Sequence, residues 1–313
     1  MSILTVTLNP ALDLETETPR VAPGEKLRCT DPSRDPGGGG LNVARAVTQL
    51  GGEAVALVAA GGPAGASLEQ MLSGRGVPVE RLPAPGDMRQ NLSVIEGASG
   101  RQFRFIFPGP AWSAADFGAV QAALRDRAAA GDWVVLSGSL PPGVTPEAQV
   151  GLVRALSAQG ARVVADTSGP ALSALAGARA GLAALRIDFE ESAALAGRAL
   201  PRAEDSVAFA AELVRAGAAD IVILARGAEG SVLVTGTESW AAPAADVPVV
   251  SRTGAGDSFV AGTVLALSRG LPLPEVLSHG CASASAAVTT AATGLCSREV
   301  REKLLPESRA RRV

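Results

Sequence analysis

Short apolar runs alternate with amphipathic segments along most of the chain. The runs predicted as strands are residues 3–8, 54–60, 133–136, 162–165, 182–185 and 221–224. The segments with helical periodicity are residues 41–50, 66–73, 146–159, 188–196, 208–216 and 258–267. Strands that are apolar throughout must be covered on both faces, and here they are separated by helices. The pattern therefore predicts an α/β fold with a parallel sheet between layers of helices.

One segment departs from this pattern. Polar and apolar positions alternate in residues 89–95 and 102–107, with Gly97 and Gly100 between them. Such alternation predicts an antiparallel hairpin with one face in water, outside the main core. Residues 26–29 are expected to form another short extended piece.

Glycine-rich turns lead into predicted helices at two places. Gly37 to Gly40 precede the helix at 41–50, and Gly254-Ala255-Gly256-Asp257 precedes the helix at 258–267. The free backbone N–H groups of such turns and helix starts attract anions. Asp257 is then either an N-cap or a base that takes a proton from a substrate hydroxyl. The glycine run is either a flexible linker or a point of close approach, and it lacks the Gly-Lys-Ser/Thr of a Walker A loop.

Other polar or glycine positions are expected to follow strands directly. Ligands of parallel α/β sheets bind at the carboxyl ends of the strands, so these positions are predicted to share one edge. They are Asp13, Gly37 to Gly40, Ser137 to Ser139, Asp166, Asp188, Arg226-Gly227 and Asp257.

The composition excludes several kinds of functional site. The chain has 313 residues and a formal net charge of −3, which gives no electrostatic case for binding nucleic acid. Its single histidine, His279, excludes a histidine-based metal cluster, and the chain has no tyrosine. Acid–base work is therefore expected to fall mainly to carboxylates.

One uncharged run, residues 276–296, is long enough to cross a bilayer. It is dominated by Ala, Ser and Thr and contains His279, so a closely packed pair of buried helices is expected instead. The N-terminus shows no signal-peptide pattern. The cysteines, Cys29, Cys281 and Cys296, are widely spaced without a C-x-x-C pattern. We therefore expect a cytoplasmic protein without a membrane partner.

The two glycine-rich junctions, at this separation, resemble the two signatures of the ribokinase-like carbohydrate kinases. The resemblance extends from the first strand to Cys296-Ser297. Residues 7–13 and 137–144 are similar to the hexose-phosphate kinases of that family. The motifs at residues 26–29, 37–40 and 89–92 look most like those of the minor bacterial 6-phosphofructokinases. The 1-phosphofructokinases and tagatose-6-phosphate kinases usually carry a lysine in the glycine run, which this chain lacks.

The resemblance implies one kinase domain over residues 1–313, with a three-layer α/β/α core and a mostly parallel sheet. A small β-sheet lid would form from about residues 13–34 and 87–108, and in relatives this lid also makes a homodimer contact. The implied activity is ATP-dependent phosphorylation of the 1-hydroxyl of fructose 6-phosphate, with Mg²⁺ and a monovalent cation such as K⁺. Fructose 1-phosphate and tagatose 6-phosphate remain alternative substrates. A sensor that binds sugar phosphate without turnover is the alternative from another class.

The resemblance also implies roles for individual residues. Asp257 would be the base, and the amides of Gly254, Ala255 and Gly256 would hold the developing charge on the transferred phosphoryl group. The sugar hydroxyls would be held by Asp13, Gly38, Gly39 and Asn42. The phosphate already on the sugar would be faced by Lys26, Arg89 and Ser139. Gly227 and Gly230 would lie along the nucleotide.

Two departures lie on the nucleotide and magnesium side. The family usually has Lys-Pro-Asn-x-x-Glu where this chain has Arg186 to Glu191, and Ser/Thr-x-Gly where it has Ala225-Arg226-Gly227. Arg186 and Arg226 are expected beside the nucleotide. Asp188 is expected to join Glu191 in holding Mg²⁺, which prefers oxygen ligands. A simple N-cap is the alternative for Asp188, since a helix start favours a carboxylate.

Overall fold

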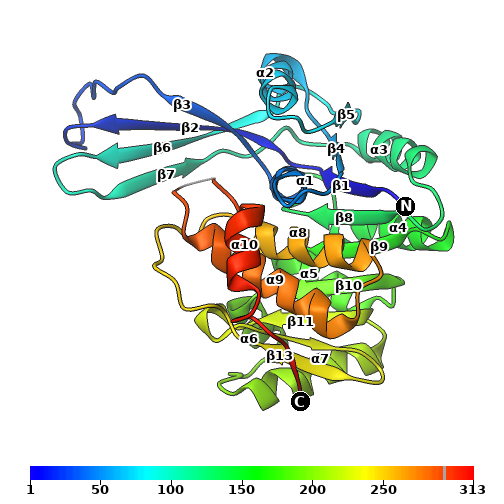
Figure 1. The fold of residues 1–313 in the computed structure, drawn as a ribbon. Coiled ribbons are helices and arrows are strands. Elements are labelled where there is room, and N and C mark those ends of the chain that lie inside the picture. The colour runs from blue at the N-terminus through cyan, green and yellow to red at the C-terminus, as the bar shows by residue number, and fades with distance from the viewer. Residues whose placement is uncertain (292–293) are drawn as a thin grey trace.

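A central sheet organises the molecule (Figure 1). The computed structural model describes residues 1–291 and 294–313. The order of the ten described strands is β14-β13-β12-β11-β10-β9-β8-β1-β4-β5. The strands from β11 to β5 in this order are parallel, and β12, β13 and β14 are antiparallel. Their bounds are β1 Ile3–Thr7, β4 Val55–Val58, β5 Val79–Arg81, β8 Trp133–Ser137, β9 Arg162–Asp166, β10 Leu182–Ile187, β11 Ala219–Ala225, β12 Ser231–Val234, β13 Ser239–Ala242 and β14 Arg311–Arg312.

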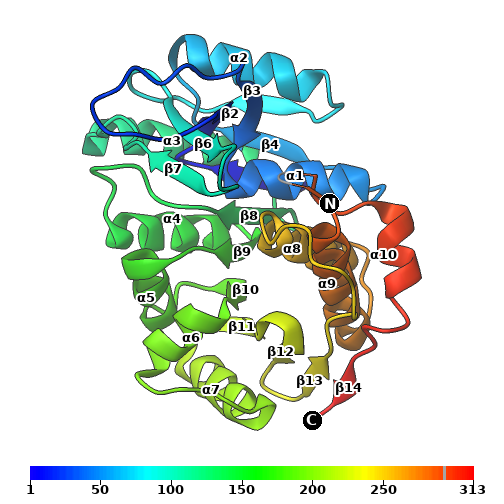
Figure 2. The same ribbon diagram turned by 90° about the vertical axis from the view of Figure 1, so that its left-hand side faces the viewer.

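Helices cover both faces of this sheet. Figure 2 shows α3 to α7 on one side and α1, α8, α9 and α10 on the other. Successive strand residues point to opposite faces, so Val134 and Val135 are both buried, one in each core. The predicted three-layer fold is confirmed. The helices are α1 Gly39–Gln49, α2 Gly62–Ser73, α3 Ala114–Arg127, α4 Pro146–Ala158, α5 Gly169–Gly177, α6 Phe189–Ala196, α7 Ala203–Ala216, α8 Ala255–Ser268, α9 Leu273–Val288 and α10 Arg298–Leu304, with a 3₁₀ turn, η1, at Gly227–Glu229.

A separate sheet projects from the body (Figure 1). Its strands are β2 Ala11–Thr18, β3 Ser33–Gly37, β6 Arg89–Glu96 and β7 Gln102–Ile106, in the order β3-β2-β6-β7. The predicted hairpin is confirmed as β6 and β7. The extended piece predicted at residues 26–29 is wrong, because those residues lie in a connection and the strand is β3, which enters the glycine run directly. Asp13 also differs from expectation, since it lies within β2 rather than after a strand.

The uncharged run at residues 276–296 contains one described helix, α9, rather than a helix pair. Residues 292 and 293 of that run lie outside the described residues. The small residues let α9 approach α8 closely. A Cβ on Gly262 would lie 2.4 Å from Ser283 Oγ, and one on Gly280 would lie 2.9 Å from the Phe259 ring. Within residues 1–291 and 294–313, the helices are all too short or too polar to cross a bilayer.

Candidate active site

The first turns of α1 and α8 meet at the carboxyl edge of the sheet. Gly254 is the N-cap of α8, with a left-handed φ of 77° that favours glycine. Asp257 follows in the first turn of this helix, and Asn42 lies near the start of α1. The Asn42 side chain donates a hydrogen bond from Nδ2 to Asp257 Oδ2 at 2.9 Å. The two glycine-rich junctions predicted from the sequence therefore form one site.

Asp257 has the electrostatic character of a base near neutrality. Burial, and next the charge of Asp166, raise the pKa of its carboxyl to about 7, while Asn42, Arg186 and Arg45 act in the opposite direction. A base works best when its pKa is close to the working pH. Perturbed carboxyls of this kind are concentrated in functional sites.

Asp166 and Arg186 form the floor beneath the first turn of α8. Arg186 Nη1 donates to Asp166 Oδ1 at 3.1 Å, and Ser137 Oγ donates to Asp166 Oδ2 at 3.2 Å. A Cβ on Gly256 would lie 3.4 Å from the Arg186 guanidinium. Arg186, expected beside the nucleotide, therefore brings a positive charge to the anion-attracting turn. Asp166 was not among the predicted site residues, although its position directly after a predicted strand was a signal.

The glycine run is packed tightly rather than being a flexible linker. Gly38 has a φ of 136°, and a Cβ there would lie 2.6 Å from Thr7 Cγ2. A Cβ on Gly39 would lie 2.3 Å from Ser137 Oγ, and one on Gly37 would lie 2.2 Å from Asp13 Oδ2. No side chain fits at these positions without displacing a neighbour. The run therefore brings bare backbone beside the Asp13 carboxylate, as a polyol ligand requires.

The predicted contacts to the sugar and its phosphate divide into two neighbouring sets. Asp13 accepts a hydrogen bond from Asn91 Nδ2 at 2.8 Å, and burial raises the pKa of the Asp13 carboxyl. Arg89 Nη2 donates to the carbonyl of Asn9 at 3.1 Å, and Asn9 Nδ2 donates to Ser139 Oγ at 3.2 Å. Asn9 thus joins two predicted residues from distant parts of the chain. Neither Asn9 nor Asn91 was among the predicted site residues.

Lys26 is not brought to this site within the chain. It lies in the connection between β2 and β3. That connection runs around the outer end of the small sheet, at the far left of Figure 1. Arg89 pairs with Ala11 at one end of β2, and the connection leaves the other end after Thr18. An eight-residue strand spans about 23 Å at 3.3 Å per residue. Lys26 and Arg89 of one chain are therefore at opposite ends of the lid.

A cavity of about 710 Å³ opens on the other side of Asp257. Gly227 and Gly230 line one wall, and Arg186 and Gly256 line the end nearest Asp257. Apolar side chains complete it, among them Ala244, Val249, Phe259, Ala284 and Val288. Volume and lining are typical of a pocket for a small organic ligand. Gly230 has a φ of 96°, and a Cβ there would lie 2.0 Å from the carbonyl oxygen of Ala242.

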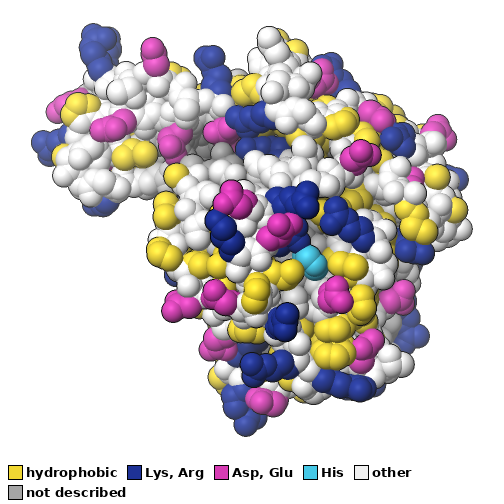
Figure 3. Space-filling view, in the orientation of Figure 1, with side chains coloured by type: hydrophobic (Ala, Val, Ile, Leu, Met, Phe, Trp, Pro, Cys, Tyr) yellow, Lys and Arg dark blue, Asp and Glu magenta, His cyan; other side chains and the backbone are white. Residues whose placement is uncertain are grey.

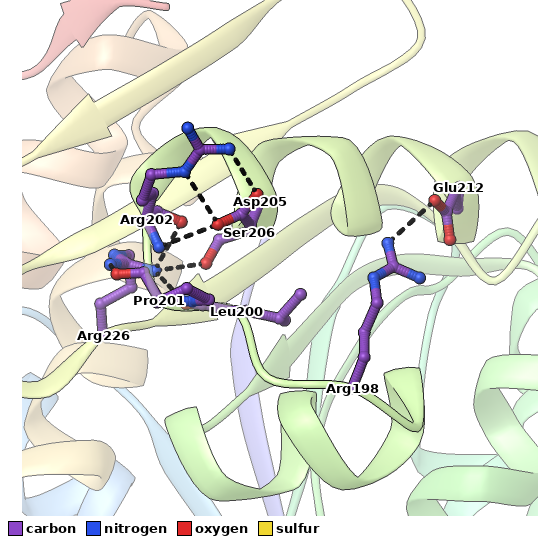
Figure 4. Close-up of polar contacts among 8 residues, drawn as sticks. All are labelled: Arg198, Leu200, Pro201, Arg202, Asp205, Ser206, Glu212 and Arg226. Atoms are coloured by element: carbon purple, nitrogen blue, oxygen red, sulfur yellow. Dashed lines mark hydrogen bonds and ion pairs between the residues drawn. The ribbon is translucent and has the colours of Figure 1, made fainter.

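The Arg226 side chain is directed into the protein, and the predicted place of this residue beside the nucleotide stays a prediction. The side chain is only 3% exposed, and Figure 4 shows it beside residues 200–202 and Ser206. Its Nη1 donates to the carbonyls of Leu200 and Arg202, each at 3.0 Å, and to Ser206 Oγ at 2.6 Å. Its Nη2 donates to the carbonyl of Pro201 at 2.9 Å and pairs with Glu229. Arg226 therefore anchors the connection between α6 and α7.

Asp188 and Glu191 form a capping box at the start of α6. Asp188 Oδ1 accepts from the Glu191 N–H at 2.8 Å, and Glu191 Oε2 accepts from the Asp188 N–H at 3.2 Å. The N-cap alternative for Asp188 is thus realised, and one oxygen of each carboxylate is used. In residues 1–291 and 294–313, no group of three or more His, Cys, Asp or Glu side chains forms a metal cage. A magnesium role for either residue stays a prediction.

One face of the molecule carries mixed charge. On the face shown in Figure 3, basic and acidic side chains are interspersed rather than gathered by sign. Nucleic-acid sites instead show a basic patch or stripe.

The model of the pfkB family of carbohydrate kinases matches residues 7–300. The chain is 39% identical over 302 residues to the ATP-dependent 6-phosphofructokinase isozyme 2 of Escherichia coli, covering 96% of this chain and 97% of the relative. It is 30% identical over 311 residues to the 1-phosphofructokinase of Bacillus subtilis, covering 99% and 100%.

The fold is also similar to solved structures. Phosphofructokinase-2 from E. coli in complex with fructose-6-phosphate matches with a TM-score of 0.88 at 38% identity, over 97% of this chain and 98% of that one. The structure of that protein in complex with potassium and its tetrameric inhibited form match with TM-scores of 0.91 and 0.89 at 39% and 38% identity, each over the same shares of the two chains.

Proposed function

The chain belongs to the pfkB family of carbohydrate kinases, and on that premise we propose that it is an ATP-dependent 6-phosphofructokinase. It would transfer the γ-phosphoryl group of ATP to the 1-hydroxyl of fructose 6-phosphate. One observation carries the proposal: Asp257, whose pKa is raised to about 7, lies between the glycine run and the cavity of about 710 Å³. The names of relatives at 38–39% identity support this choice of substrate.

In this proposal the sugar lies against Asp13, Gly38, Gly39 and Asn42. Asp257 takes the proton of the reacting hydroxyl, whose oxygen then attacks the γ-phosphorus of ATP bound in the cavity. The bond from that phosphorus to the β–γ bridging oxygen breaks, and ADP leaves with the bridging oxygen. The amides of Gly254, Ala255 and Gly256 face the charge that develops on the transferred group, with Arg186 beneath them. Phosphoryl transfer asks a protein mainly for such positioning and charge neutralisation.

Arg89 and Ser139 are proposed to bind the phosphate already on the sugar. Arg89 remains a guanidinium although burial lowers its pKa, and its planar donors suit a phosphate group. Its hydrogen bonds to the carbonyls of Asn9 and Pro10 fix its direction without neutralising its charge. That charge is thus kept for an anionic ligand.

Gly227 and Gly230 are proposed to lie along the nucleotide, where bare backbone lets a planar base approach. The residues fit an Mg²⁺ ion that arrives with ATP, because Mg²⁺ usually takes only one or two protein carboxylates. Glu191 and Asp188 would hold it through the oxygens that the capping box does not use. Mg²⁺ would neutralise charge on the phosphates. A monovalent cation such as K⁺ is proposed by analogy with the potassium complex of the E. coli protein.

We propose that the whole chain acts as one kinase domain in the cytoplasm, with the sheet β3-β2-β6-β7 as its lid and a homodimer formed through that lid. The edge strand β7 leaves Phe105 48% exposed and Ile106 56% exposed, and Phe107 just after it 50% exposed. Unpaired edges and exposed apolar patches favour association. Lys26 could then contact the sugar phosphate only in a second copy of the chain, since it is remote from Arg89 of its own.

The proposal is tested by measuring ADP production with fructose 6-phosphate, fructose 1-phosphate and tagatose 6-phosphate side by side. We expect the highest kcat/KM with fructose 6-phosphate. A higher value with fructose 1-phosphate would favour the 1-phosphofructokinase alternative, which the B. subtilis relative supports. Calorimetric binding of a sugar phosphate without ADP production from any of the three would instead identify a sensor.

A further inference from the structure

A buried arginine lies directly behind the proposed base. Arg45 is only 6% exposed, within a helix that otherwise buries small and apolar side chains. A guanidinium is costly to bury unless its donors are used. Its Nη1 donates to Asn42 Oδ1 at 3.1 Å, across the three-residue spacing that brings side chains together on a helix.

Arg45, Asn42 and Asp257 therefore form a directional chain of hydrogen bonds. Arginine can only donate, and an ionised carboxylate can only accept. The carboxamide of Asn42 has one accepting end and one donating end, and it lies between them. Only one orientation of this amide satisfies both neighbours. If it were turned over, its oxygen would face the Asp257 carboxylate and its NH₂ group would face the guanidinium.

We propose that Arg45 is a positioning residue for phosphoryl transfer, which fixes the Asn42 amide so that Asp257 stays ionised and directed toward the reacting hydroxyl. This inference rests on the proposed role of Asp257 as the base. It gives a catalytic reason for placing a charge where the packing of α1 alone would favour an apolar residue.

Charged groups face both ends of this chain of hydrogen bonds. Arg45 is faced by Asp35 of β3 and by the like charge of Arg75, as well as by Asp257. Among the described residues, Asp166 at the end of β9 and burial of the site raise the pKa of Asp257, whereas Arg186 from β10 and Arg45 from α1 lower it. Removing Arg45 would subtract one positive charge and free the Asn42 amide to rotate. Both changes disfavour the ionised carboxylate of Asp257. Both therefore move the acid limb, the part of the pH profile in which activity rises as Asp257 ionises, to higher pH.

The experiment compares Arg45→Met, Arg45→Gln and Arg45→Lys by the pH profile of kcat/KM. Met removes both charge and donor, Gln keeps a donor without charge, and Lys keeps both. We expect the acid limb of Arg45→Met to move up by about 0.5–1 pH unit, within the range for losing a nearby opposite charge. Activity below the limb would fall roughly three- to ten-fold. Gln should lie between Met and the parent, and Lys should lie close to the parent.

Arg301→Met is the matched control, because Arg301 on α10 is also buried, at 5% exposure, and contacts His279 rather than the site. It should lower stability and leave the acid limb in place. Acid limbs of Arg45→Met and Arg45→Gln that coincide with the parent's would overturn the proposal. If Arg45→Met does not fold, the Gln and Lys profiles decide.

A second readout does not depend on turnover. The carboxyl carbon of Asp257 can be followed by NMR through a pH titration and assigned with Asp257→Asn. Its midpoint should rise in Arg45→Gln, and an unchanged midpoint would contradict the inference. If the parent protein makes no ADP, the proposed kinase activity is contradicted. Failure of the proposed function can therefore be distinguished from failure of the inference about Arg45.

Discussion

Asn42 and Asp257, from the first turns of α1 and α8, are joined by a hydrogen bond of 2.9 Å. The proposed base is therefore held from the sugar side of the site, while the amides of its own helix face the cavity. Replacing Asp257 by Asn keeps the shape and removes the base. We expect kcat to fall by roughly two to four orders of magnitude, with a much smaller change in KM. Near-normal kcat would remove Asp257 from this role.

The raised pKa of Asp257 predicts opposite effects of pH on activity and stability. The base must be ionised, so kcat/KM of the free enzyme should rise with pH through about 7. The folded state holds the proton more tightly than the unfolded state, whose pKa is near 3.8. The contribution of Asp257 to the free energy of unfolding is therefore fully present below pH 3.8. It is lost as the pH rises through about 7.

Thermal melts of Asp257→Asn and the parent across this range test that sign. We expect the variant to melt higher than the parent above pH 7, with the difference shrinking toward pH 4. A difference that grew at low pH would contradict the assignment.

Arg89 and Lys26 are expected to affect the sugar phosphate from two different chains. Arg89→Ala should raise KM for the sugar phosphate, because it removes a charge-assisted hydrogen bond that contributes about 1.5–3 kcal/mol of binding free energy. KM for ATP should stay nearly unchanged. Lys26→Ala should do the same only if the lid of a second copy supplies the lysine.

Mixed dimers of Lys26→Ala and Asp257→Asn chains test that origin. If Lys26 acts across the dimer, the Asp257→Asn chain lends its lysine to the intact base of its partner, and activity returns at one site. If Lys26 acted within its own chain, mixing would restore nothing. Sedimentation that finds a monomer would also contradict the proposal.

The layers of the fold followed from local pattern, because buried parallel strands are apolar throughout and helices repeat at 3.6 residues. The glycine junctions could also be predicted, since four consecutive glycines directly before a helix favour a close approach over a flexible linker. The direction in which long side chains point could not be predicted in this way. Arg226 directly follows β11 and Arg186 lies next to the last residue of β10, yet only the Arg186 side chain faces the site. That difference depends on the carbonyls of residues 200–202, which the chain brings in from the α6–α7 connection.

Arg226 should therefore matter for stability rather than for nucleotide affinity. Arg226→Met would leave buried carbonyls and Ser206 without their donor, at a cost of roughly 3 kcal/mol. Arg198→Met is the matched control, because Arg198 pairs with Glu212 at the surface (Figure 4) and should cost less than about 0.5 kcal/mol. Melting curves and KM for ATP, measured on the same variants, distinguish a structural role of Arg226 from a role in binding the nucleotide. A raised KM for ATP without lost stability would support the predicted nucleotide role.

Asp188 and Glu191 are expected to act through their negative charge as well as through the capping box of α6. Both carboxylates lie near Arg186 and Asp166, so three acidic groups surround one guanidinium beside the proposed nucleotide cavity. Burial raises the pKa of Glu191, a cost that a bound cation would reduce. Excess negative charge next to triphosphate is repulsive unless a divalent ion lies between them.

Asp188→Asn and Glu191→Gln remove these charges while keeping oxygens for the capping box, since Asn caps as well as Asp and Gln replaces Glu at N3. Each should raise the free Mg²⁺ needed for half-maximal rate by roughly two- to ten-fold, the equivalent of about 0.4–1.4 kcal/mol. The stability of Asp188→Asn and the sugar KM of both variants should stay unchanged. Asp188→Ala separates the cap, because it should also cost about 1 kcal/mol of stability. If the magnesium curves of Asp188→Asn and the parent coincide at fixed MgATP, Asp188 serves the helix alone, because its charge was the only property removed.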